Sequence, residues 1–339
     1  MECHWLLNTQ LKFPIEGKYH FNRVASNGDC SIRISDLTVK DDDGDWQCQV
    51  YLKRIHIGPP VRVTVLVRPD KPKIFYNSQP PTDGKMEVEA NKTVQIECIS
   101  KNGNPLPRLN WILNDRPVGD SKSSQNMSAG LAKTTLTYTF DKKMNGNRLV
   151  CNSQHQLVQE SDMVELNVVY RPEVLIGRDV ITVEEGSDLK EVFCRADANP
   201  PVSSYRWLDT ENPKILFSDQ QELRITSINR DYHNKVYECT AENSIGRSNV
   251  DSFKMNVLYE PRIVSESENQ QIRVGRTVGF GCQIDANPAP TIVWYHLSLL
   301  TGDIKRVQSE SDNPAVLLIK NVTYADEGKC AHPGGDHNE

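Results

Sequence analysis

The chain has 339 residues, of which 37% are hydrophobic and 25% charged, and its formal net charge is -6. This composition is typical of folded domains rather than of a disordered chain. The negative charge gives no attraction for nucleic acid or for an anionic membrane surface. The length suits three to four domains of about 100 residues each.

The nine cysteines indicate the compartment in which the chain works. Their wide spacing excludes most zinc sites, which need closely paired ligands, and favours long-range disulfides formed in an oxidising compartment. Residues 1–5 lack the basic and apolar regions of a signal peptide, and no apolar stretch of about 18 residues could span a membrane. We therefore interpret the sequence as a fragment of an extracellular or cell-surface protein.

Residues 1–68 contain three predicted strands with inward-type side chains, which are Cys3 and Trp5 in the first, Ile32, Ile34 and Leu37 in the second, and Trp46 and Cys48 in the third. Such alternation is typical of half-buried strands. Between the last two predicted strands, the acidic residues 41–45 resemble a calcium loop, but an EF-hand loop has about twelve residues and ends in Glu. We predict instead a turn between two strands, in which Asp42 locks the corner.

The rest of the chain carries a repeat in which a Cys is followed by a Trp twelve or thirteen residues later and then by a second Cys. The three sets are Cys98, Trp111 and Cys151; Cys194, Trp207 and Cys239; and Cys282, Trp294 and Cys330. This spacing is the mark of an immunoglobulin sandwich, in which a disulfide joins strand B to strand F and the strand C Trp packs against it. The predicted fold class is all-β, with tandem immunoglobulin-like β-sandwiches.

Prolines mark the loops and the ends of the predicted domains. An Asn-Pro pair precedes each repeat Trp, at Asn104, Asn199 and Asn287, and predicts the B–C loop because proline cannot donate to a central ladder. Further prolines follow apolar runs and predict domains at residues 1–68, 69–171, 172–260 and 261–339. Junctions this short predict a stiff rod.

The first domain is predicted to be incomplete, with its strands A and B upstream of Met1. Cys48, on strand F, therefore lacks its usual partner. Cys3 and Cys30 each lie two residues before an inward-pointing side chain, so both are expected to enter the core from opposite sheets. We predict a Cys3–Cys30 disulfide; a Cys3–Cys48 disulfide and two buried free thiols are the alternatives.

The fourth domain is predicted to be truncated near strand F. After Asp326-Glu327-Gly328-Lys329 the pattern leads us to expect Tyr, one more residue and then Cys, but Cys330 stands two residues early. Two strand residues span about 7 Å, which strains disulfide geometry. Cys282–Cys330 is therefore the weakest of the predicted pairs, and residues 331–339 carry no strand G pattern.

The sequence holds no nucleotide-binding, zinc-protease or serine-hydrolase motif, so we predict no enzyme, no cofactor and no metal site. Three sequons predict N-glycosylation, at Asn91, Asn126 and Asn321. They fall before a predicted strand B, in a polar loop and at the end of a predicted strand E.

Several stretches resemble one branch of the immunoglobulin superfamily. They are Gly28-Asp29-Cys30-Ser31-Ile32, the run from Asp42 through Gly44 and Trp46 to Val50, and Ala198-Asn199-Pro200-Pro201 before Tyr205 and Trp207. The chain resembles the ectodomains of the nephrin, Kirre, Roughest and Sticks-and-stones group, including a second domain with Leu149 where a corner Tyr usually stands. The resemblance implies cell-surface adhesion, homophilic or with other immunoglobulin superfamily molecules. A soluble receptor or decoy and a structural matrix array are the alternatives.

The expected binding face lies on the first domain. If Cys3 and Trp5 point inward, then His4 and Leu6 point outward, and Gln47 and Gln49 do the same on strand F, with Tyr51 beyond the strand end. Strands C and F share a sheet, so these side chains form one uncharged face. The resemblance implies the same face, because the group docks through this sheet. The expected partner is a protein, with no nucleic acid and no small-molecule substrate.

Overall fold

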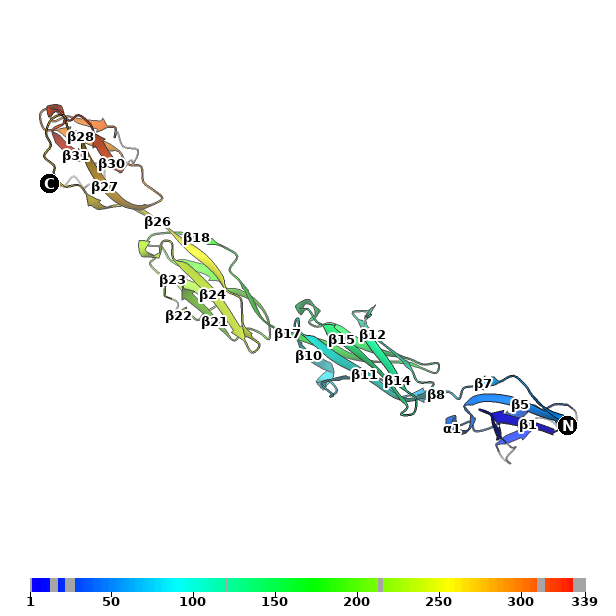
Figure 1. Ribbon diagram of the computed structural model, residues 1–339. Coiled ribbons are helices and arrows are strands. Elements are labelled where there is room, and N and C mark those ends of the chain that lie inside the picture. Colours follow the sequence, from blue (N-terminus) through cyan, green and yellow to red (C-terminus); the bar gives the residue numbers. More distant parts are fainter. Residues whose placement is uncertain are drawn as a thin grey trace. The chain divides into compact units, whose positions relative to one another are not determined.

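The computed structural model describes residues 2–12, 18–21, 28–119, 121–212, 216–309 and 315–331. The chain is built of β-strands with a few short helices, and it divides into two compact units, Met1–Tyr170 and Arg171–Glu339 (Figure 1). The described strands form four β-sandwiches with the immunoglobulin-like arrangement, which we call the first to fourth domains. The predicted boundaries and the predicted rod stay predictions.

The first domain has one larger sheet and one small one. The larger sheet has the strand order β2 (Gln10–Lys12), β1 (Glu2–Leu7), β5 (Gly44–Leu52) and β6 (Arg54–Ile57), and β7 (Val61–Val63) also pairs with β5. The small sheet pairs β3 (Tyr19–Phe21) with β4 (Ile32–Ile34). The helix α1 (Val39–Asp42) leads into β5. The fully buried part of the core is small and consists of Leu7, Tyr19 and Trp46.

The second domain is a full sandwich. One sheet has the order β10 (Lys85–Glu89), β17 (Gln159–Leu175), β16 (Arg148–Gln154), β12 (Arg108–Leu113) and β13 (Arg116–Pro117). The other contains β14 (Ser121–Asn126), β15 (Leu131–Thr139), β11 (Thr93–Asn104), β8 (Val67–Pro69) and β9 (Lys73–Tyr76). Alternating apolar residues from both sheets meet in a core around Trp111, Leu136 and Phe140, all of them at most 1% exposed.

The third domain repeats this plan. Its larger sheet contains β22 (Leu216–Ser218), β21 (Ser204–Asp209), β24 (Val236–Asn243), β26 (Asp251–Glu266), β18 (Val180–Glu184) and β25 (Gly246–Arg247). Strands β19 (Leu189–Phe193) and β23 (Glu222–Ile225) form the facing pair, and β20 (Arg195–Asn199) follows β19. Trp207, Tyr237 and Phe253 are fully buried and contact one another through their rings.

The fourth domain is more sparsely packed. Strand β27 (Val278–Asn287) pairs with β30 (Val316–Ile319), while β29 (Ile304–Val307), β28 (Trp294–Ser298) and β31 (Gly328–Ala331) form a second sheet. Among the described residues, its buried core cluster contains Cys282, Trp294 and Leu317, and Val278 is buried as well.

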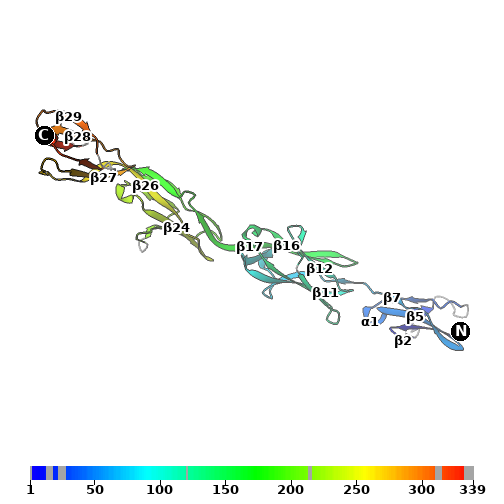
Figure 2. The same cartoon turned by 45° about the horizontal axis from the view of Figure 1, so that its top comes forward.

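Only one of the three boundary prolines ends a strand, since β8 ends at Pro69. Strand β17 runs through Pro172 and β26 runs through Pro261 without a break. Within β26 the chain changes partner instead: it pairs with β24 as far as Lys254 and with β27 from Tyr259 onward (Figure 2). An extended backbone suits proline, and its missing N–H costs nothing where the strand exchanges one ladder for the next.

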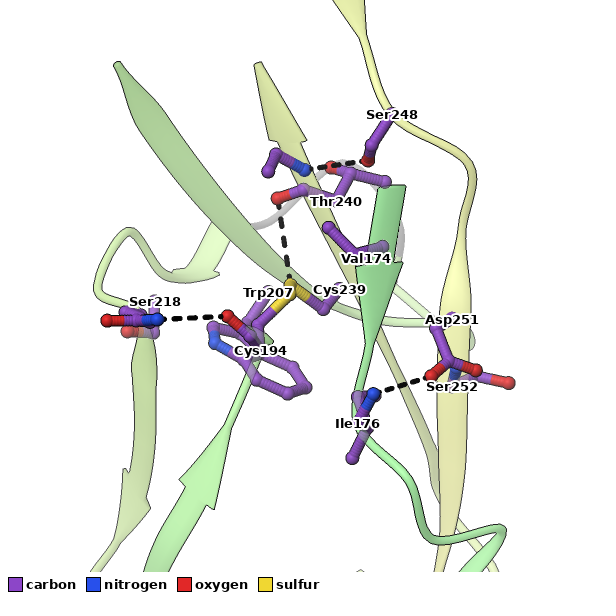
Figure 3. The surroundings of a disulfide bond; sticks show 12 residues. Val174, Ile176, Cys194, Trp207, Ser218, Cys239, Thr240, Ser248, Asp251 and Ser252 are labelled. Atoms are coloured by element: carbon purple, nitrogen blue, oxygen red, sulfur yellow. Dashed lines mark hydrogen bonds between the residues drawn. A yellow bond between two sulfur atoms is a disulfide. The ribbon is translucent and has the colours of Figure 1, made fainter. Parts of the chain in front are cut away.

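The predicted cross-sheet disulfides are present in the second and third domains. Cys98 is bonded to Cys151 and Cys194 to Cys239, with Cα–Cα distances of 6.4 and 6.3 Å. Figure 3 shows the indole of Trp207 beside the Cys194–Cys239 bond. Its Nε1 donates to the carbonyl of Gln220 at 3.0 Å, which satisfies the ring nitrogen inside the core.

The predicted Cys282–Cys330 pair is wrong, because Cys282 carries a free, buried thiol. The reason lies in the register: Cys330 stands opposite His296, two residues beyond Trp294. In the second and third domains the strand F cysteine stands directly opposite the strand C Trp. A cysteine shifted by two residues lies one full pleat repeat away from the position that meets strand B.

Candidate protein-binding site

The corner before β5 sets the position of the first-domain sheet. The carboxylate of Asp42 is completely buried; it accepts from the Tyr19 hydroxyl at 2.5 Å and the Thr38 amide at 2.7 Å, and it pairs with Lys18 Nζ at 2.7 Å. The indole nitrogen of Trp46 donates to the Asp42 carbonyl at 2.9 Å. The predicted role of Asp42 as the lock of this corner is confirmed.

The charge of Asp42 is held by these partners. Burial acts to raise the pKa of Asp42, but hydrogen bonds from Lys18, the Thr38 amide and Tyr19 bring it below its usual value. Burial, helped by the nearby carboxylate, raises the pKa of Tyr19. A buried, ionised carboxylate needs several hydrogen-bond donors to offset the free energy lost when it leaves water. The corner therefore fixes where β5 begins and which of its side chains face inward.

The pairing of β1 with β5 decides which side chains share a face. Trp5 stands opposite Cys48 and Leu7 opposite Trp46, and this set points into the core. Between them, His4 stands opposite Gln49 and Leu6 opposite Gln47. Directly opposed residues of an antiparallel pair lie on the same side of the sheet. The structure therefore brings together four of the five predicted binding residues on the outward side.

Tyr51 also lies on the outward side of the sheet, but its place along the strand differs from the prediction. It lies inside β5 rather than beyond the end of the strand, and it stands opposite Ile55 of β6. Its side chain is 52% exposed. The strand extends further than predicted because a hairpin, turning at Lys53 with a φ of 58°, pairs its last residues with β6.

Leu6 requires a correction. It lies on the outward side of β1, yet it is only 8% exposed, so it offers little surface to a partner. Leu11 of β2 stands directly opposite Leu6 and is 42% exposed. The exposed aliphatic group at this edge is therefore Leu11, and Leu6 supports it from beneath.

Two further side chains complete the face and were missed in the sequence. Ile55 and Ile57 of β6 stand opposite Tyr51 and Gln49, and they are 58% and 55% exposed. The alternation Ile55-His56-Ile57, which begins two residues after Lys53, is a signal that could have identified them. We call the set the outer face; its members are His4, Leu6, Leu11, Gln47, Gln49, Tyr51, Ile55 and Ile57.

The outer face is uncharged at its centre and is bordered by charged residues at both ends. At one end, Glu2 stands opposite Tyr51 across the β1–β5 pair. At the end near β7, Asp45 stands opposite Arg62, whose guanidinium approaches its carboxylate at 3.8 Å. The amide of Gln47 donates to the Gly58 carbonyl at 3.3 Å, which orders part of the polar surface. Depleted charge, exposed Tyr and Ile, and a charged border are the features of an interface core and rim.

The cysteines of the first domain support the sheet from behind. Cys3 of β1 is bonded to Cys30, just before β4, so the predicted bridge ties the two sheets together. Cys48 is unpaired and half-buried, and burial raises the pKa of its thiol. The Trp5 indole donates to the Cys30 carbonyl at 2.8 Å, a second tie across the core.

The three sequons lie outside the first domain. Asn91 is in the turn between β10 and β11, Asn126 ends β14, and Asn321 follows β30; all three are exposed. The Oδ1 of Asn126 accepts from the Ser128 hydroxyl at 2.8 Å within its own sequon. The first domain contains no sequon, so its sheet is free of predicted glycan attachment.

Comparison with known proteins relates the chain to cell-surface immunoglobulin proteins. Residues 78–162 match the CD80-like C2-set immunoglobulin domain family, and residues 260–329 match the Immunoglobulin domain family. The Irregular chiasm C-roughest protein of Drosophila melanogaster is 28% identical over 83% of this chain and 40% of its own length. Synaptogenesis protein syg-1 of Caenorhabditis elegans is 26% identical over 95% of this chain and 49% of its own length.

The chain thus spans less than half the length of these curated relatives. Among solved structures, the full ectodomain (Ig1-Ig3) of mouse nectin-like molecule 4 is 18% identical, with a TM-score of 0.43 over 75% of this chain and 89% of that chain. Kin of IRRE-like protein 2 of Homo sapiens is a further relative, 27% identical over 85% of this chain and 40% of its own length. The chain is an immunoglobulin superfamily protein related to the Kirre, Roughest and SYG-1 group.

Proposed function

We propose that the chain acts in cell-surface adhesion or recognition and that it binds a partner protein through the outer face of the first domain. The observation that carries the proposal is the row of exposed Tyr51, Ile55 and Ile57 beside the uncharged amides of Gln47 and Gln49. Exposed aromatic and aliphatic groups that stay solvated cost free energy, which burial against a partner would recover. Amides among them supply hydrogen bonds that fix the orientation of the partner.

The proposed partner is another immunoglobulin superfamily adhesion molecule, either a second copy of this protein or a related one. The relationship to Roughest and SYG-1 supports this class of partner. We also propose that Asn91, Asn126 and Asn321 carry N-glycans, which would leave the first-domain sheet uncovered. Glycosidase treatment of secreted material should lower the mass of peptides carrying each of the three asparagines.

The proposed location is outside the cell, at its surface. In the part of the chain that the structure describes, no helix is long and apolar enough to cross a membrane. The second candidate function, a soluble receptor or decoy, uses the same outer face without an anchor. The full coding sequence distinguishes the two candidates, because only the adhesion molecule needs a membrane-spanning segment.

The proposal is tested with the full chain coupled to fluorescent beads. Gln47→Asp and Gln49→Asp together place two negative charges at the centre of the outer face, where a partner would have to bury them. We expect clustering with beads of the same chain, or with beads carrying the Drosophila Roughest ectodomain, to fall at least tenfold. Secretion and the far-UV circular dichroism spectrum should stay unchanged.

The matched control changes two exposed glutamines of the second domain, Gln95→Asp and Gln154→Asp, which add the same charge elsewhere. These variants should cluster like the unmodified chain. Equal clustering by the Gln47 and Gln49 variant would move the binding site to another surface. Equal loss in both double variants would mean that net charge, not the outer face, controls clustering.

A further inference from the structure

Two asparagines end strand B in different domains. Asn104 is the last residue of β11 in the second domain, and Asn287 is the last residue of β27 in the fourth. Both are half-buried and both precede a proline. The segment of chain that enters each domain runs antiparallel to this strand end, so that Asn104 stands opposite Val67 and Asn287 opposite Tyr259.

Each side chain makes the same backbone contact. The Nδ2 of Asn104 donates to the Val65 carbonyl at 2.9 Å, and the Nδ2 of Asn287 donates to the Val257 carbonyl at 2.6 Å. In both cases the acceptor lies two residues before the residue that the asparagine opposes. Val65 and Val257 are buried, 9% and 0% exposed, where the chain leaves the preceding domain. Each bond therefore ties the end of strand B of one domain to the segment of chain that leaves the domain before it.

Each side-chain nitrogen also donates a second hydrogen bond, in both cases to the oxygen of another side chain. The Nδ2 of Asn104 donates to Oδ1 of Asp43 at 2.6 Å, and that of Asn287 donates to Oδ1 of Asn256 at 2.8 Å. Both acceptors belong to the preceding domain. An amide NH₂ has two hydrogens to donate, and at both sites it has a backbone oxygen and a side-chain oxygen to receive them.

The surroundings of the two asparagines differ, although the contact is shared. Near Asn104, the Asp43 carboxylate also accepts from the Val65 amide at 2.9 Å and from Arg62 at 2.7 Å. Near Asn287, the Val257 amide donates to His233 Nδ1 at 3.2 Å. The common element of the two junctions is therefore the asparagine and the carbonyl that it holds.

We propose that Asn104 and Asn287 are junction latches. By this we mean side chains that restrain movement between consecutive domains because they bind the segment of chain that leaves the preceding domain. Donating to both oxygens requires a side-chain amide at the length of asparagine. Aspartate has the same shape but offers only acceptors, which would face the valine carbonyl and a second oxygen. Alanine would leave both oxygens without their donor, which costs free energy where the oxygen is buried.

Hydrogen–deuterium exchange of the full chain tests the proposal. Asn104→Asp should raise the exchange rate of peptides covering residues 65–69 at least fivefold, and Asn287→Asp should do the same for residues 257–263. Peptides from the cores, covering β16 and β24, should exchange as in the unmodified chain. The alanine variants should show the same pattern with a smaller increase, which separates loss of the donor from the added charge.

Asn77→Asp and Asn269→Asp are the matched controls, because both asparagines are exposed and lie in the same two domains. They should leave the junction peptides unchanged. Unaltered exchange at either junction in the Asn104→Asp or Asn287→Asp variant would overturn the common role. Faster exchange throughout the core of the affected domain would overturn it too, since the asparagine would then maintain the fold of one domain rather than restrain two.

Discussion

Trp5 stands directly opposite Cys48 across the β1–β5 pair, in the same relationship that Trp111 has to Cys151 across β12 and β16. Cys151 is bonded to strand B, whereas Cys48 is a free thiol. The register of strands C and F is therefore the same whether or not the strand F cysteine is bonded to strand B. In the first domain, strand pairing and the buried Asp42 corner hold this register.

Removing the two kinds of cysteine should have very different effects on stability. Changing Cys98 and Cys151 together to alanine should destabilise the second domain by about 4 kcal/mol, because the bond closes a long loop in the unfolded chain. Changing Cys48 to alanine should cost less than about 1.5 kcal/mol, since only a half-buried thiol is lost. Urea unfolding followed by hydrogen exchange in each domain measures both. A large loss from the Cys48 change would show that its thiol has a bonded partner.

The free thiols should be recognisable by alkylation. Cys48 and Cys282 should react with iodoacetamide once the chain is denatured, without any reductant, because neither is bonded in the structure. In the folded chain both should react slowly, since burial raises the pKa of each thiol and limits access. Cys3 and Cys30 should react only after reduction. Peptide mass spectrometry measures the alkylation of all four cysteines. A labelled Cys3 in unreduced material would contradict the Cys3–Cys30 disulfide.

Lys18 should be essential for the corner of the first domain. Lys18→Met leaves the fully buried carboxylate of Asp42 without its cation, so we expect a destabilisation of about 3 kcal/mol. Lys40→Met, at an exposed position in α1, should change stability by less than about 0.5 kcal/mol. Hydrogen exchange of peptides from β1 and β5 in increasing urea provides the measurement, because the chain has five tryptophans and its fluorescence does not report on the first domain alone. A Lys18 variant as stable as the Lys40 variant would show that hydrogen bonds alone hold Asp42.

The third and fourth domains should loosen from each other in acid. Arg230 donates to Glu185 at 2.9 Å and to Asp285 at 3.1 Å and lies over the ring of Tyr259, so its hydrogen bonds hold the pKa of both carboxyls below their usual values. A lowered folded-state pKa means that the stabilisation is present above the unfolded value, about 4, and is lost as the pH falls below it.

Exchange protection of residues 257–263, corrected for the intrinsic effect of pH, should therefore fall between pH 5 and pH 3, a window of about one unit on either side of the unfolded value. Arg230→Gln should lower this protection already at pH 6 and flatten its pH dependence. Lys254→Gln, an exposed lysine on β26, should keep the profile of the unmodified chain. Identical profiles for all three proteins would mean that the Arg230 contacts do not restrain the junction.

The sequence by itself determined the class of fold. The Cys-Trp-Cys spacing predicted the sandwiches and the bonds Cys98–Cys151 and Cys194–Cys239, because residues at fixed intervals on strands B, C and F must meet in one core. The acidic corner could be predicted for the same reason: Asp42 is close in sequence to the strand that it locks. The sequence also showed that Cys330 stands two residues before the position expected for the strand F cysteine. The pairing of Cys330 with His296 agrees with this shift.

The tertiary structure decided which surface the first domain presents and where the connecting strands end. The burial of Leu6 and the exposure of Leu11, Ile55 and Ile57 depend on β2 and β6 pairing at the edges of the sheet. Likewise β26 continues through its proline because a second domain supplies new partners. Alternation along one strand fixes the side to which a residue points, but its exposure depends on neighbours that are distant along the chain.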